Sequence, residues 1–113
     1  MNNEARDPMR SLTRAKPSWD GELVLVCRRC QKDLRRGIDG RHTKLSDWLP
    51  GALKRAGARK AFTVIECGCF DLCPKQGVAL MRASEANSAK PLCVYRAGEN
   101  PQAVVEWLLN ASD

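Results

Sequence analysis

The chain has 113 residues, enough for one domain, and 43% of them are hydrophobic, as in globular proteins. No apolar run approaches the length of a membrane span, and the N-terminus carries charges of both signs without an apolar core, so neither a membrane protein nor a secreted one is expected. The net charge of +6 is concentrated between residues 27 and 60, where eleven basic side chains accompany three acidic ones. We therefore expect a cytoplasmic protein with a positive field on one part of its surface.

The start of the chain differs in composition from the rest. Residues 1–20 contain Pro8 and Pro17, many polar side chains and no periodic pattern of apolar residues. Such a segment buries too little apolar surface to fold by itself, so we expect a flexible N-terminal arm. The globular domain is expected to span residues 21–113.

The first half of this domain predicts a strand, a loop and a helix. The apolar run 22–26 is typical of a strand inside a sheet, and the polar, glycine-containing stretch 31–41 is typical of a loop. Apolar residues at helical spacing after Ser46 predict a helix that ends at Gly57.

The second half predicts three strands and a helix. The strands are expected at residues 61–66, 77–82 and 92–96. Asn100 can cap a helix that starts at the following proline and runs to Asn110. The order β-α-β-β-β-α predicts an α/β fold in which a small mixed sheet of about four strands is covered by two helices.

Four cysteines form two close pairs, each directly after a predicted strand. Cys27 and Cys30 follow the first strand, and Cys69 and Cys73 follow the second. Two strands that lie side by side would bring all four sulfurs to one end of the sheet. Four convergent thiolates are the usual ligand set for an iron–sulfur cluster or a structural zinc ion. The spacing therefore predicts a metal centre with these four cysteines as candidate ligands.

The chain resembles the thioredoxin-like [2Fe–2S] ferredoxins, a family that includes a subunit of respiratory NADH dehydrogenase. The resemblance rests on the first strand ending in Cys27 (LVLVC), the loop at residues 66–78 (ECGCFDLCPKQGV) and the final strand and helix at residues 95–109. It covers about residues 22–110. The first cysteine pair is more closely spaced than is usual in the family.

The resemblance implies a thioredoxin-like fold and an electron carrier without a catalytic nucleophile. A [2Fe–2S] cluster would be held by Cys27, Cys30, Cys69 and Cys73, and single electrons would pass to a redox partner protein. The positive field indicates a partner with an acidic docking face. Nucleic acid is not expected to bind, because aromatic residues, at 5%, are few for base stacking.

Two other classes of protein fit the same cysteines. A zinc-binding module that contacts nucleic acid or protein would use the same two pairs as ligands. A thiol–disulfide oxidoreductase would use the Cys27–Cys30 motif alone, with Arg28 and Arg29 favouring the thiolate and Pro91 facing the site.

The remaining thiols and the only histidine have less specific patterns. Cys67 is one residue from Cys69 and is expected to point to the other face of its strand, as a spare thiol or substitute ligand. Cys93 lies in an apolar strand and is expected in the core. His42 could complete a ligand set if Cys30 does not bind, but a solvated loop histidine is the more common finding.

Overall fold

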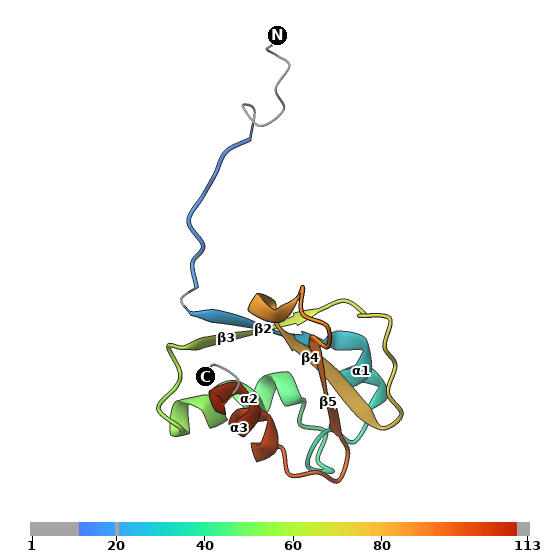
Figure 1. Cartoon of the computed structure of the whole chain (residues 1–113). Helices are drawn as coiled ribbons and strands as arrows, with labels where there is room; N and C mark the ends of the chain where they lie inside the picture. Colours follow the sequence, from blue (N-terminus) through green and yellow to red (C-terminus); the bar gives the residue numbers. More distant parts are fainter. Residues whose placement is uncertain (1–11, 20, 111–113) are drawn as a thin grey trace.

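The structure is a computed structural model that describes residues 12–19 and 21–110 (Figure 1). Within these residues the chain forms a four-stranded mixed sheet and three α-helices, so the predicted α/β fold class is confirmed. The elements are, in chain order, β2 (Glu22–Cys27), α1 (Arg28–Asp33), α2 (Leu45–Arg55), β3 (Phe62–Cys67), β4 (Gly77–Arg82), the short 3₁₀ helix η2 (Ala83–Glu85), β5 (Leu92–Arg96) and α3 (Gln102–Asn110).

The sheet has the strand order β3-β2-β4-β5. The strands β2 and β3 are parallel, with Cys27 opposite Cys67. The connection through α1 and α2 brings the chain back to the end of the sheet at which β2 began, so β3 runs in the same direction. β4 pairs with β2 in the antiparallel direction, and β5 pairs with β4 in the same way. This mixed topology is compatible with a small thioredoxin-like α/β fold.

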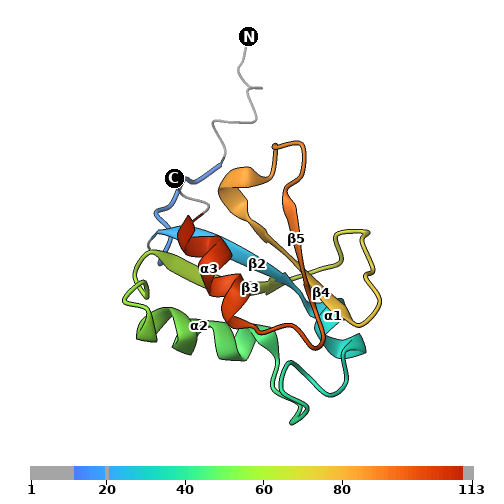
Figure 2. The same ribbon diagram turned by 60° about the horizontal axis from the view of Figure 1, so that its bottom comes forward.

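The core lies between one face of the sheet and the two longer helices. In Figures 1 and 2, α2 and α3 run side by side over this face. Both helices bury an apolar stripe there, as their sequence periodicity predicts. The largest fully buried side chains are Leu45, Leu49, Leu53, Leu80, Leu108, Val24, Val26, Val78 and Val105.

The helix α1 was not expected, because the stretch 31–41 was predicted to be a loop and its residues show no apolar periodicity. The structure has a helix of six residues directly after β2. Two of its side chains, Cys30 and Gln31, are buried, so tertiary contacts rather than propensity stabilise this short helix. Its first turn is capped by the Cys27 sulfur, which accepts a hydrogen bond from the Cys30 amide at 3.4 Å.

A largely buried ion pair joins β2 and β4 at the end of the sheet opposite to the cysteines. Arg82 is only 6% exposed, and its Nη2 atom lies 2.8 Å from Oε1 of Glu22. Ser84 donates two further hydrogen bonds to the same carboxylate, from its backbone amide and its hydroxyl. Burial raises the pKa of Glu22, but these donors outweigh it and hold the pKa below its ordinary value.

The described part of the predicted arm, residues 12–19, extends away from the sheet and is exposed (Figure 1). Residues 1–11 and 20 lie outside the described residues. No helix in the described part of the chain is long and apolar enough to cross a membrane.

Candidate metal centre

The two cysteine pairs lie at one end of the sheet. Cys27 is the last residue of β2, and the loop at residues 68–76, which carries the second pair, follows β3. Because β2 and β3 are parallel, both strands end at the same edge. Figures 1 and 2 show α1 and this loop next to each other at that edge. The sheet therefore brings the two cysteine pairs to one end of the domain.

The first pair is built into the protein interior. Cys27 has no exposed surface, and Cys30 is 5% exposed. The Cys30 thiol points away from α1 toward the second loop, where its sulfur lies 3.9 Å from the carbonyl oxygen of Leu72. Leu72 immediately precedes Cys73, so this contact joins the two halves of the site.

The second pair lies on the exposed loop. Both Cys69 and Cys73 are exposed, and the Cys69 sulfur accepts a hydrogen bond from the amide of Asp71 at 3.2 Å. Asp71 has a φ of 64°, which turns its amide back toward this sulfur. The local conformation thus supplies a backbone donor to a candidate ligand, just as α1 does for Cys27.

The thiols of the two pairs influence one another. Burial raises the pKa of the Cys30 thiol to about 11, a hydrogen bond with the backbone of Ala79 opposes this, and the Cys27 and Cys73 sulfurs raise the pKa further. A hydrogen bond with Cys69 and the charge of that residue raise the pKa of Cys73. Gathered thiols of this kind resist ionisation until a cation compensates the charge.

The other two thiols of the sheet lie in different places. The parallel register pairs Cys67 with Cys27 at the end of the sheet that carries the candidate ligands. Burial raises the pKa of Cys67, the charges of Cys27 and Cys69 add to the increase, and Arg28 opposes it. Cys93 is half-buried in β5 and packs against the core.

His42, a possible substitute ligand, and Pro91, which the thiol–disulfide alternative places opposite Cys27 and Cys30, both lie away from the cysteine pairs. His42 is exposed in the loop after α1, where its Nδ1–H donates to the carbonyl oxygen of Arg35 at 2.8 Å. Pro91 precedes β5 at the far end of the sheet, since Leu92 pairs with Met81 near the end of β4 and not with its start. Pro91 therefore does not face the Cys27–Cys30 pair.

A buried glutamine, which sequence reasoning missed, fixes the orientation of α1. Gln31 donates from Nε2 to Oε2 of Glu66 at 2.7 Å, and its Oε1 accepts from the amide of Ser46 at 2.7 Å. Glu66 also accepts from the Ser46 hydroxyl at 3.2 Å and lies 3.6 Å from Nε of Arg28. Gln31 thereby ties α1 to both α2 and β3, directly beside the cysteines.

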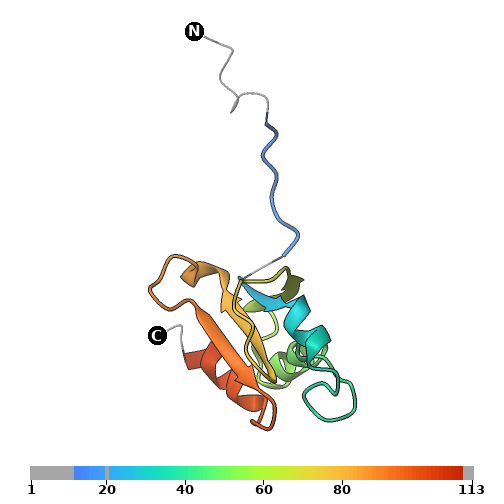
Figure 3. The same cartoon turned by 90° about the vertical axis from the view of Figure 1, so that its right-hand side faces the viewer.

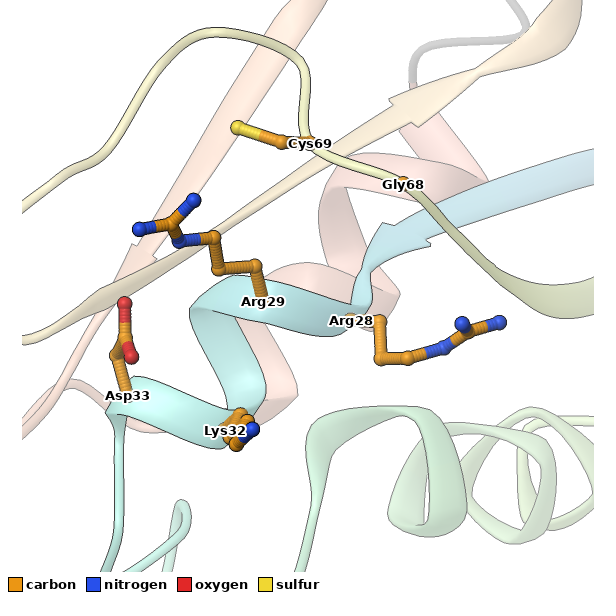
Figure 4. A pocket seen from close by; sticks show the side chains of 6 residues that line it. All are labelled: Arg28, Arg29, Lys32, Asp33, Gly68 and Cys69. Carbon is orange, nitrogen blue, oxygen red and sulfur yellow. The ribbon is translucent and has the colours of Figure 1, made fainter.

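A pocket of about 490 Å³ opens between α1 and the second cysteine loop (Figure 4). It is lined by Arg28, Arg29, Lys32, Asp33, Gly68 and Cys69. In Figure 4 the Arg29 side chain extends toward the side of Cys69, whereas Arg28 points away from it. Arg29 also opposes the rise in the pKa of Cys73, which places its positive charge beside the second pair.

Two further observations bear on metal binding. Among the described residues, no three His, Cys, Asp or Glu side chains form a group that could hold a single metal ion. The four candidate ligands instead form two pairs, joined through Cys30 and Leu72 and supplied with backbone donors to sulfur. All six cysteines are free thiols. Four thiolates are the number of ligands that a binuclear iron–sulfur cluster requires.

Comparisons of the chain with protein-family models, with curated proteins and with solved structures found no match.

Proposed function

We propose that this protein is a small electron carrier that holds a [2Fe–2S] cluster through Cys27, Cys30, Cys69 and Cys73. The observation that carries the proposal is the placement of both pairs at one end of the sheet, where the Cys30 thiol contacts the loop of the second pair at Leu72. The loop motif at residues 66–78 is also the main basis of the resemblance to thioredoxin-like [2Fe–2S] ferredoxins. Electron transfer is therefore the function that the site supports best.

The surrounding residues supply what such a cluster requires. Backbone amides of Cys30 and Asp71 donate to the sulfurs of Cys27 and Cys69, and hydrogen bonds of this kind stabilise thiolate charge. Arg29 lies beside the second pair and Arg28 lies near Cys67, so their charge would offset part of the negative charge of the four thiolates. When bound, the cluster would supply one-electron exchange, and the nearby cations would favour its more negative, reduced form.

The thiol–disulfide alternative receives less support. A nucleophilic cysteine needs an accessible thiolate, yet Cys27 has no exposed surface and burial raises the pKa of Cys30 to about 11. Pro91 lies at the other end of the sheet. These three features favour a ligand role for the first pair over a catalytic one.

The expected partner is a redox protein with an acidic docking face. The basic side chains around α1 lie beside the site through which electrons would pass. A positive field there attracts an acidic surface and orients it before contact.

Metal content tests the proposal most directly. Protein purified without oxygen should be brown and contain iron and acid-labile sulfide in equal amounts. A colourless protein with one zinc ion per chain would replace the proposal with a zinc-stabilised interaction module. Metal-free protein with a reversible Cys27–Cys30 disulfide would replace it with a thiol–disulfide enzyme.

A further inference from the structure

Nine of the eleven basic residues between 27 and 60 form two separate groups, one beside the cysteines and one at the end of α2. The first group lies on α1 and in the loop that follows it, beside the cysteines: Arg28, Arg29, Lys32, Arg35 and Arg36. The second group lies at the end of α2 and directly before β3: Lys54, Arg55, Arg59 and Lys60. Since β3 leads away from the second group toward Cys67, the strand separates the groups by roughly 17 Å.

The first group surrounds two adjacent pockets that share Asp33. One is the pocket next to Cys69, and the other, of about 670 Å³, lies between the loop after α1 and the turn that contains Gly98. Arg35 and Arg36 line the second pocket. Among the described residues that line either pocket there is no phenylalanine, tyrosine or tryptophan. A groove for single-stranded nucleic acid usually supplies such rings for base stacking.

The loop that presents Arg35 and Arg36 has a defined internal structure. The carboxylate of Asp39 accepts hydrogen bonds from the amides of Arg41 and Thr43 and from the Thr43 hydroxyl. The amide of His42 donates to the carbonyl oxygen of Arg36, and its ring donates to that of Arg35. The loop projects from the body next to α1 in Figures 2 and 3. These hydrogen bonds thus fix the backbone at Arg35 and Arg36 before any partner binds.

A close approach in the same loop also requires a glycine. Gly37 has a φ of 70°, and a Cβ atom there would lie 2.2 Å from the carbonyl oxygen of Thr43. Only glycine avoids both the left-handed strain and this clash. The loop is therefore built as a compact projection and not as a loose connection.

We infer that this basic loop, residues 34–44, and α1 form the docking surface for an acidic segment of the redox partner. The inference rests on the proposed function and adds the place where the partner binds. Arginine side chains bind carboxylates with directed hydrogen bonds, and a preorganised loop loses less entropy on binding. Asp33 lines both the pocket next to Arg35 and Arg36 and the pocket next to Cys69. A partner bound to the basic loop would therefore contact the protein beside the metal centre.

A fluorescently labelled glutamate-rich decapeptide serves as the probe, and binding is measured by fluorescence anisotropy at several salt concentrations. The test variant is Arg35→Glu/Arg36→Glu. The matched control, Arg59→Glu/Lys60→Glu, changes two neighbouring exposed residues of the far group and lowers the net charge equally. Exposed charges are screened over about 8 Å at physiological ionic strength, which is half the distance between the groups.

At physiological ionic strength the loop variant should bind the peptide about tenfold more weakly, whereas the control should change affinity less than about twofold. Circular dichroism should show that both variants stay folded. Equal losses in the two variants would overturn the inference. Tighter binding of an oligonucleotide of the same charge, lost in the loop variant, would also overturn it, because the surface would then be a nucleic-acid site.

The peptide assay does not depend on the metal, so the two proposals fail separately. Loop-dependent peptide binding by a protein that contains no iron would support the acidic docking surface and refute electron transfer. Iron and sulfide in a protein whose peptide binding is unaffected by Arg35→Glu/Arg36→Glu would support the carrier and refute the docking surface.

Discussion

The replacement of Gln31 by methionine tests whether α1 is held in place by its buried amide. Methionine has a similar volume but neither donor nor acceptor, so the change removes the hydrogen bonds to Glu66 and Ser46 and leaves the packing largely intact. Gln31 is only 6% exposed, and water cannot easily replace these partners. The variant should therefore be less stable than the natural protein.

The expected loss follows from the two bonds. The bond to the Glu66 carboxylate is charge-assisted and contributes about 1.5–3 kcal/mol, and the bond from the Ser46 amide contributes about 1 kcal/mol. Burial of the more apolar methionine side chain offsets about 1 kcal/mol of this loss. The free energy of unfolding should fall by about 1.5–3 kcal/mol.

Urea unfolding followed by circular dichroism measures this difference. The matched control is Gln102→Met, the same change at an exposed position in the first turn of α3, which should stay within about 0.5 kcal/mol of the natural protein. Iron content gives a second readout, because a displaced α1 would misplace Cys30. A Gln31→Met protein as stable as the control variant would show that the amide does not hold the helix.

Three other predictions concern the pH dependence, the loop geometry and the roles of the cysteines. Because the folded pKa of Glu22 is lowered, the natural protein should exceed Glu22→Gln in stability at neutral pH, and urea titrations should show this difference shrinking as pH falls below about 4.5; a constant difference would refute the assignment. A Cβ atom at Gly77 would lie 2.8 Å from a backbone oxygen, so Gly77→Ala should cost about 1–3 kcal/mol in thermal or urea unfolding, whereas Gly68→Ala, which meets no atom within 4 Å, should cost little. Changing any of the four candidate ligands to serine should bleach or shift the visible spectrum, and Cys67→Ser and Cys93→Ala should leave it nearly intact; loss of the spectrum in Cys67→Ser alone would mean that the ligand set is wrong.

The strands were the part of the fold most readily predicted from sequence. The runs 77–82 and 92–96 match β4 and β5, β2 is one residue longer than predicted, and β3 is shifted by one residue. Their apolar, β-branched residues bury a face of the sheet, so local pattern and tertiary environment agree. The parallel pairing of β2 and β3 followed from the helical crossover between them.

The missed features depend on contacts between distant segments. The polar sequence of α1 gives no helical periodicity, and its helix is stabilised by the burial of Cys30 and of Gln31, whose partners lie 15 and 35 residues away. Equally, a charge count along the chain could not show that Arg59 and Lys60 lie at the opposite end of β3 from the cysteines.

The two halves of the candidate centre differ in how they are held. Cys27 caps a helix and is fully buried, so folding of the core fixes the first half without any metal. Cys69 and Cys73 lie on an exposed loop that contacts the first half through a weak hydrogen bond from the Cys30 thiol to Leu72. Metal binding would therefore add most of its stabilisation at the second loop, because that loop gains fixed contacts that folding does not provide. The same loop borders the pocket beside Arg29, so the step that completes the centre would also complete the surface next to the proposed docking site.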